Sequence, residues 1–376
     1  MKKSIIVPLS LAIALSMPLV VNAYFSEDVL YTKNKIFGMN SLECDVNDDG
    51  STNVLDFIQI KHDMLKDAEN ISSNTNKVYV SNIDELKSAL SNAQAGDEII
   101  LKSGIYEDTS SKWTPFTSSG EGTEDNPIII RSENPKDKAH IKCTDTSSSI
   151  ALQITGDYWI IQDLEVSTAQ KGIVLDNSNY SIISNCDVHN IGSEGVHFRD
   201  NSSYCTIKDS YIYDTGVVSS EYGEGVYVGS SQWTSGYGYS CDYNTIQHCT
   251  FNNIGAEHID IKEFTTGTII EDCTMHGSGM IGKNYADSFI DIQGNGCIIR
   301  NNTCYQDNNS IIVDAFQVHV LADGWGFDNQ VYDNICYFDD TTSYILRGWD
   351  CGCTAKNNIR YPEGNTYDDD SITILD

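Results

Sequence analysis

The fold of this 376-residue chain is decided by five short segments: Gly195-Val-His-Phe-Arg199, Gly225-Val-Tyr-Val-Gly229, His258-Ile-Asp-Ile-Lys262, Phe289-Ile-Asp-Ile-Gln293 and Ala315-Phe-Gln-Val-His319. Apolar residues alternate with other residues in each segment, which is the period-two pattern of a β-strand. Their second residues lie 26 to 33 positions apart. A second series of short strands is centred on Ile183, Ile207, Ile246, Ile270, Ile299 and Val331. The chain therefore repeats one unit of short strands.

Short strands that recur at this interval, with no helical spacing of useful length between them, favour a right-handed parallel β-helix. A propeller or a sandwich would need hairpin turns and longer strands. We therefore expect an all-β, pectin lyase-like β-helix over residues 78–376. The alternate apolar residues should point inward, and the residues between them should form columns on one outer face.

Two of these outward columns carry the chemistry. One contains His197, Tyr227, Asp260, Asp291 and Gln317, and its neighbour contains Arg199, Gly229, Lys262, Gln293 and His319. Successive coils lie about 4.8 Å apart, so Asp260 and Asp291 can share a calcium ion beside Lys262. Such a metal would neutralise a uronate carboxylate, and a lysine with a depressed pKa would remove the C5 proton in a β-elimination. The alternative is a solvated face on which Lys262 merely pairs with the two aspartates.

The charge balance limits the partners. The chain has 54 acidic and 23 basic residues, a net charge of −31, which argues against nucleic acid and against an anionic membrane surface. An acidic polysaccharide would need a local cluster of cations, for which Arg199, Lys262, Lys283 and Arg300 are the candidates.

The first 23 residues have the features of a secretory signal peptide. Lys2 and Lys3 precede an apolar run, and Val21-Asn22-Ala23 supplies small residues for cleavage. We therefore expect a secreted, extracellular protein, and no later run is long enough to span a bilayer. Export permits disulfides, but several of the 12 cysteines recur inside the strand patterns. We expect these to stack as small buried side chains; they are Cys186, Cys249, Cys273, Cys304 and Cys336.

Residues 45–56 match a twelve-residue calcium loop, with Gly50 at the sharp turn. The oxygen ligands fall at Asp45, Asn47, Asp49, Ser51, Asn53 and Asp56. A solvated acidic turn is the alternative. The loop and the helix expected after it resemble one EF-hand-like repeat of a dockerin, although a second repeat is not found. The resemblance implies docking to a cohesin-bearing scaffold protein and association with a cellulosome. Residues 24–66 would form this region, and residues 67–77 a linker.

From about Gly96 to Asn309 the chain resembles polysaccharide lyase family 6, the group of chondroitinase B and alginate lyases. The segments that carry the resemblance are Gly96–Tyr106, Gly122–Pro135, Leu152–Trp159, Gly223–Ser231 and Glu257–Glu263. The last implies that Glu257 is a calcium ligand and that Lys262, five residues on, is the catalytic base. Two positions depart from the family: Gly255 replaces a further glutamate ligand, and Gln293 replaces the catalytic arginine. Asp260 and Asp291 are candidates for the missing ligand, and Arg199, Lys283 and His319 for the missing cation.

These observations predict a secreted polysaccharide lyase that uses calcium to cleave a uronate-containing polymer. The catalytic candidates are Lys262, Arg199 and His319, and the metal candidates are Glu257, Asp260 and Asp291. The candidates for binding substrate are His197, Tyr227, Trp233, Lys283 and Gln293. The alternative is a non-catalytic carbohydrate-binding or cellulosome-associated β-helix protein. A β-helix hydrolase is a weaker option, because it would need a Gly-His-Gly segment that the chain lacks. Alginate, pectate and glycosaminoglycans all remain open as the polymer.

Overall fold

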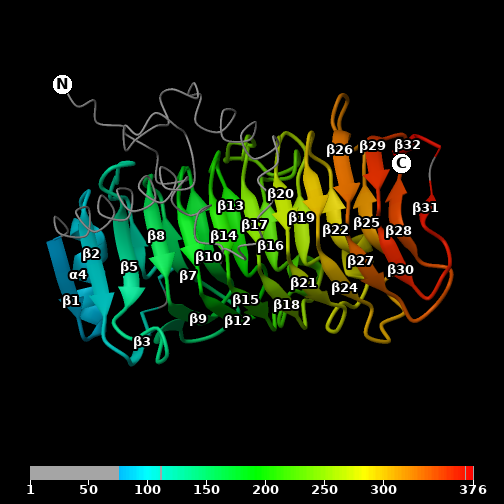
Figure 1. Ribbon diagram of the computed structural model, residues 1–376. Helices are drawn as coiled ribbons and strands as arrows, with labels where there is room; N and C mark the ends of the chain where they lie inside the picture. Colours follow the sequence, from blue (N-terminus) through cyan, green and yellow to red (C-terminus); the bar gives the residue numbers. More distant parts are fainter. Residues whose placement is uncertain (1–75, 111, 369, 376) are drawn as a thin grey trace, which may run out of the picture. The chain divides into compact units, whose positions relative to one another are not determined.

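A computed structural model describes residues 76–110, 112–368 and 370–375, and within them the chain forms three parallel β-sheets of 12, 10 and 10 strands. The expected signal peptide, the calcium loop at Asp45 to Asp56 and nearly all of the linker lie outside these residues. The expected all-β parallel architecture is confirmed (Figure 1). No helix in the described part of the chain is long and apolar enough to cross a membrane.

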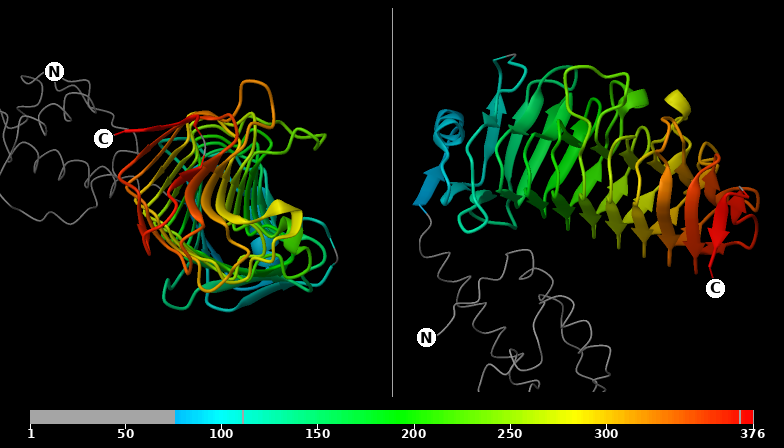
Figure 2. Two further views of the ribbon diagram at one scale, coloured as in Figure 1. Left: turned by 90° about the vertical axis from the view of Figure 1, so that its right-hand side faces the viewer. Right: turned by 90° about the horizontal axis from the view of Figure 1, so that it is seen from above.

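Each coil passes through the three sheets in turn, as the view along the stack shows (Figure 2). The first sheet contains β1 (Asn76–Val80), β2 (Asp97–Leu101), β5 (Ile128–Ser132), β8 (Trp159–Gln162), β11 (Ile182–Ser184), β14 (Thr206–Lys208), β17 (Thr245–Gln247), β20 (Ile269–Glu271), β23 (Ile298–Arg300), β26 (Phe327–Tyr332), β29 (Gly352–Lys356) and β32 (Ile372–Ile374). The second contains β4 (Thr117–Ser118), β7 (Ile150–Ile154), β10 (Lys171–Asp176), β13 (Val196–Arg199), β16 (Val226–Val228), β19 (Ile259–Ile261), β22 (Ser288–Ile292), β25 (Asp314–Val318), β28 (Tyr344–Gly348) and β31 (Tyr367–Asp368). The third contains β3 (Ile105–Asp108), β6 (Ala139–Cys143), β9 (Leu164–Ala169), β12 (Asp187–Ile191), β15 (Tyr211–Tyr213), β18 (Thr250–Asn252), β21 (Thr274–His276), β24 (Thr303–Tyr305), β27 (Ile335–Tyr337) and β30 (Ile359–Tyr361).

The predicted register is confirmed in the first two sheets. The second series of strands pairs from Ile183 through to Val331 in the first sheet, one residue per coil. In the second sheet the inward positions Val196, Val226 and Ile259 pair in the same way, and all three side chains are fully buried. The apolar columns therefore fill the interior, and the alternation of the strands sends the polar columns outward.

One helix was not predicted. α4 (Ile83–Asn92) follows β1, and its buried Leu86 and Leu90 pack against the first coil. The Asn82 side chain accepts a hydrogen bond from the Glu85 backbone N–H at 3.0 Å, which caps the first turn. The helix contacts β1, β3 and β4 at the β1 end of the stack (Figure 1), and it covers the apolar end that the first coil would otherwise expose. The expectation that no useful helix interrupts the strand region is therefore wrong at its start.

The cysteines are confirmed as buried packing residues. All 11 cysteines in the described part of the chain are buried and outside disulfides, and Cys304 and Cys336 lie opposite each other on neighbouring strands. Asparagines continue the same kind of stacking at the turns. Asn302 Nδ2 donates to the Ile270 carbonyl and to Asn334 Oδ1, each at 3.0 Å. These ladders satisfy backbone groups that the turns of a β-helix leave without a strand partner.

Candidate functional site

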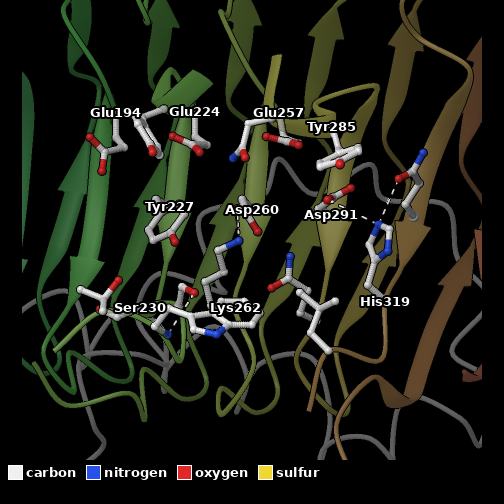
Figure 3. Close-up of a pocket in the computed structure, with 18 of the residues that line it drawn as sticks. Glu194, Glu224, Tyr227, Ser230, Glu257, Asp260, Lys262, Tyr285, Asp291 and His319 are labelled. Atoms are coloured by element: carbon white, nitrogen blue, oxygen red, sulfur yellow. Dashed lines mark hydrogen bonds and ion pairs between the residues drawn. The ribbon is translucent and has the colours of Figure 1, made fainter. Parts of the chain in front are cut away.

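A groove of about 910 Å³ runs over the outer face of the second sheet. Its floor is the predicted column, because His197, Tyr227, Asp260, Asp291 and Gln317 pair in register from β13 to β25. The column continues to Arg347 on β28. Figure 3 shows Tyr227, Asp260 and Asp291 side by side on successive strands. The sequence therefore predicted the floor of the groove residue by residue.

The second predicted column lies beside the first. The backbone N–H groups of Lys262, Gln293 and His319 donate to Val228, Ile261 and Ile292, each on the preceding coil, at 2.8 to 2.9 Å. Arg199, Lys262, Gln293 and His319 all line the groove.

A third column was missed. Glu194, Glu224 and Glu257 occupy the same position on three successive coils, linked by hydrogen bonds from Gly195 N–H to Glu224 O and from Gly225 N–H to Glu257 O. Figure 3 shows the three carboxylates in a row above Tyr227 and Asp260. The signal was present in the sequence, because each glutamate stands two residues before the first apolar residue of its strand.

Glu224, Glu257 and Asp260 form a tight, buried cluster. One carboxylate oxygen from each lies within 4.8 Å of the other two. Burial raises the pKa of Glu224 and of Glu257 well above the usual value, and neighbouring carboxylates raise both further. Burial also raises the pKa of Asp260 to about 6, although Lys262 opposes the shift. Glu224 Oε2 and Asp260 Oδ1 are buried without a hydrogen-bond partner. Unpaired carboxylate oxygens that repel one another fit a hard cation such as calcium.

Two of the three predicted calcium ligands lie in this cluster. Glu257 and Asp260 belong to the cluster, whereas Asp291 lies outside it, accepting a hydrogen bond from Ser288 Oγ at 2.7 Å and facing His319 Nε2 at 3.5 Å. A side chain at position 255 would be crowded, because its Cβ would lie 3.0 Å from the Thr215 carbonyl oxygen and 3.1 Å from the Gly216 Cα. Glu224, from the neighbouring coil, is the third carboxylate of the cluster.

Lys262 lies beside the cluster, and both line the groove. Its Nζ is 2.7 Å from Asp260 Oδ2 and 5.3 Å from the centre of the Tyr227 ring. Burial alone would lower the pKa of Lys262, but Asp260 and then Tyr227 outweigh it and raise the pKa. The depressed pKa that the elimination would require of Lys262 is therefore not met in this arrangement, and the alternative pairing of Lys262 with Asp260 describes the contact correctly. The expected second pairing, with Asp291, is not among its ion pairs.

Gln293 connects Lys262 to the next carboxylate. With its amide oxygen turned toward Lys262, it accepts from Nζ at 3.2 Å, and its nitrogen donates to Glu263 Oε2 at 2.9 Å. The position at which the family has an arginine is thus filled by a neutral group that orients the lysine.

Tyr227 and His197 are neutral groups on the groove floor. Burial raises the pKa of Tyr227 well above its usual value, so the phenol keeps its proton. Burial also holds the pKa of His197 well below its usual value. The His197 Nε2 lies 2.8 Å from the Gly229 carbonyl, and the ring meets Tyr227 edge-on at 4.6 Å. His197, on the preceding strand, therefore packs against Tyr227 and helps to hold its ring in place.

Two of the other predicted cations, Arg199 and His319, line the groove, and each lies beside an aspartate. Arg199 binds Asp176 through two hydrogen bonds of 2.6 and 2.7 Å and lies over the Tyr237 ring. His319 stacks on Trp349 at 4.4 Å, and its pKa is raised because Asp291 outweighs the effect of burial.

Two predicted cations do not line the groove. Lys283, on the 3₁₀ turn η3 (Lys283–Tyr285), pairs with Glu221 at 3.5 Å. Arg300 pairs with Glu271 in the first sheet. The groove instead contains two cations that were not predicted, Lys171 and Arg347. At its rim, the predicted Trp233 is 76% exposed and the unpredicted Tyr285 is 89% exposed.

Comparisons with known proteins agree with this fold. The model of the Pel9A-like, right-handed β-helix region matches residues 65–334. The crystal structure of an alginate lyase from Paenibacillus sp. str. FPU-7 is 41% identical, with a TM-score of 0.75, over 79% of this chain and 99% of that one. The pectate lyase Pel9A structure is 15% identical, with a TM-score of 0.53, over 79% of this chain and 80% of that one. Pectate lyase L of Dickeya chrysanthemi is 26% identical over 152 residues, which are 39% of this chain and 36% of that protein.

The chain therefore matches about a third of the length of pectate lyase L, and nearly all of the alginate lyase. The resemblance stated from the sequence is confirmed at the level of a pectate lyase-like right-handed β-helix. The expected class of enzyme, a polysaccharide lyase, is supported by the same relationships.

Proposed function

This chain belongs to the Pel9A-like right-handed β-helix family and is a polysaccharide lyase, and we propose that it cleaves alginate by β-elimination in the groove of the second sheet. The choice of alginate is supported by the 41% identical alginate lyase, of which this chain covers 99%. The observation that carries the mechanism is the position of Lys262 Nζ, which lies 5.3 Å from the centre of the Tyr227 ring beside buried carboxylates. Pectate is the second candidate, on the weaker likeness to the pectate lyases.

Elimination needs one group to remove the C5 proton and another to protonate the departing O4. We assign the first role to Lys262, which reaches the groove from the second column and is held by Gln293. We assign the second to Tyr227, whose buried phenol keeps its proton until the leaving oxygen takes it. Arg199 and His319 would bind substrate carboxylates, since Arg199 stays protonated in its pair with Asp176 and the raised pKa of His319 favours its cation.

Calcium is part of the proposal. Glu224, Glu257 and Asp260 would hold the ion, because their oxygens converge and two of these oxygens have no other partner. When bound, calcium would neutralise the uronate carboxylate and offset the negative charge that raises the pKa of Lys262. The side chains of Tyr227 and Gln293 then keep the lysine directed at the groove.

Export and docking are proposed from the sequence alone. The basic start and apolar run of residues 1–23 support secretion, and the loop at residues 45–56 supports a calcium-bound, dockerin-like module. N-terminal sequencing of the protein from the culture medium would test export. Binding to a cohesin in calcium, and its loss in EDTA, would test docking.

The activity is tested by absorbance near 235 nm, where an unsaturated uronate absorbs. The substrates are alginate and polygalacturonate, each with calcium and with EDTA. Lys262→Ala and Tyr227→Phe should each lower the rate on alginate by about 10²- to 10⁴-fold. Lys208→Ala is the matched control, because Lys208 ends β14 in the first sheet. Full activity in Lys262→Ala would refute the mechanism. Binding of alginate by the folded protein without any product would support the carbohydrate-binding alternative.

A further inference from the structure

Two histidines and a glutamate converge on the third sheet. His140 lies on β6, Glu165 on β9 and His189 on β12, so the three residues come from successive coils. His140 pairs with Glu165 across the first two strands, and Ser167 pairs with His189 across the next two. β9 and β12 lie side by side along the lower part of the view in Figure 1. None of the three residues lines the groove.

The side-chain distances are those of a metal site. His189 Nε2 lies 3.0 Å from Glu165 Oε1, and His140 Nδ1 lies 3.5 Å from the same oxygen. One ligand atom from each of the three residues lies within 4.8 Å of the other two. Zinc bonds of 2.0 to 2.1 Å in a tetrahedron separate neighbouring ligand atoms by about 3.3 Å. The two distances to Glu165 bracket that value.

A hydroxyl group lies beside the first imidazole, where it can act as an outer-shell partner. His140 Nε2 lies 2.7 Å from Ser167 Oγ, which in turn lies 3.0 Å from Thr168 Oγ1. With its proton on Nε2, His140 would donate to Ser167 Oγ and leave the Nδ1 lone pair for a metal beside Glu165, which is the outer-shell contact of metal-binding histidines. Burial lowers the pKa of His140, although Glu165 opposes the shift, so the neutral ring is favoured.

The second imidazole is positioned by stacking. The His189 ring lies 4.6 Å from the Tyr213 ring and is tilted by 8° from it. A hydrogen bond alone explains the 3.0 Å contact between His189 and Glu165. The strand register brings His140 beside Glu165, and the 3.5 Å between Nδ1 and Oε1 is longer than the usual N–H···O range, so this contact leaves the nitrogen open to another partner.

We propose that His140, Glu165 and His189 bind a divalent transition-metal ion that links three successive coils. Imidazole nitrogens with one carboxylate suit zinc, copper or nickel, whereas the all-oxygen cluster in the groove suits calcium. The side chains are about a fifth to a third exposed, so water can take a fourth position. The site is structural, since it lies on a different sheet from Lys262 and the groove.

The test is a titration of the full-length, calcium-loaded protein with Zn²⁺ by calorimetry, and with Co²⁺ followed by its visible absorption. His140→Gln and His189→Gln should each weaken binding of Zn²⁺ at least tenfold and remove the tetrahedral Co²⁺ band. His276→Gln is the matched control, because His276 lies on the same sheet and pairs with Asp307 at 2.9 Å. It should leave binding unchanged.

A second measurement separates this site from the groove. If the protein is an alginate lyase as proposed, all three histidine variants should cleave alginate at the wild-type rate. Their circular dichroism spectra should match that of the native protein. The inference is overturned if the wild type binds Zn²⁺ no more tightly than His140→Gln and His189→Gln, or if His276→Gln weakens binding as much as they do. An inactive wild type that still binds Zn²⁺ through these histidines would refute the proposed function and leave this inference standing.

Discussion

The calcium-free protein should lose stability as the pH rises from 4 to 7, because of the carboxylates in the groove. An acid whose pKa is raised by folding releases its proton first in the unfolded chain, so its ionisation favours unfolding. For Asp260 the loss begins near the ordinary pKa of 3.8 and continues to about 6. A difference of this size between the folded and unfolded pKa corresponds to about 3 kcal/mol of stability. Glu224 and Glu257, with pKa values raised well above 4.5, extend the loss to higher pH.

The assay is urea unfolding in EDTA at pH 4, 5.5 and 7. Glu224→Gln keeps the shape of the side chain and removes a charge that raises the pKa of Glu257. This variant should be no less stable than the wild type at pH 4 and more stable at pH 7. Glu133→Gln, at an exposed position away from the groove, is the control and should follow the wild type.

Calcium should reverse the trend, since the ion binds the ionised carboxylates and only the folded protein brings them together. The wild type should therefore gain more stability from calcium at pH 7 than at pH 4, and Glu224→Gln should gain less than the wild type. The reasoning is refuted if stability in EDTA is level or rises over this range and Glu224→Gln behaves as the wild type does.

Three further predictions concern the β-helix itself. The 11 described thiols are buried, and burial raises the pKa of those such as Cys186 and Cys205 to about 12. Ellman's reagent should therefore react with them only after denaturation. Rapid reaction of several thiols in the native protein would contradict this prediction. Asn302→Ala should destabilise by about 1–3 kcal/mol in urea unfolding, because it leaves the Cys273 N–H and the Ile270 carbonyl without their partner, and a neutral result would show that water replaces the amide. Arg199→Lys should lower the free energy of unfolding in urea by about 1–3 kcal/mol, because lysine cannot make both hydrogen bonds to Asp176. The control Lys208→Arg should leave that free energy unchanged.

The sequence was sufficient to predict two of the three columns of the groove. In a parallel β-helix, residues at the same point of successive coils lie one strand apart, so period-two alternation and the repeat interval together define each column. Tyr227 and Asp260 could therefore be placed on neighbouring strands from their numbers alone. Glu224 could have been placed by the same arithmetic, but it precedes its strand, and the alternating pattern marks only the positions inside strands.

Other features depend on contacts that a repeat pattern does not encode. The raised pKa of Lys262 follows from an ion pair of 2.7 Å with Asp260, and a change in either side-chain rotamer would remove it. The departures at Gly255 and Gln293 were visible in the sequence, yet only the packing shows why they are tolerated. Gly255 lies against Thr215, and Gln293 bridges Lys262 and Glu263.

The charge pattern of the groove bears on how an acidic chain of net charge −31 could bind an anionic polymer. Each of the four lysines and arginines that line the groove already has a carboxylate partner; the pairs are Lys171–Glu194, Arg199–Asp176, Lys262–Asp260 and Arg347–Asp314. A uronate carboxylate would therefore have to displace a protein carboxylate from its lysine or arginine. Otherwise it would need a positive charge from another source, such as a bound metal ion. An ion held by Glu224, Glu257 and Asp260 would occupy these carboxylates, release Lys262 from Asp260 and give the substrate a positive partner. Binding of alginate should then depend on calcium even in Lys262→Ala, where turnover is lost, and binding by that variant that is equally tight in EDTA would assign recognition to the arginines instead.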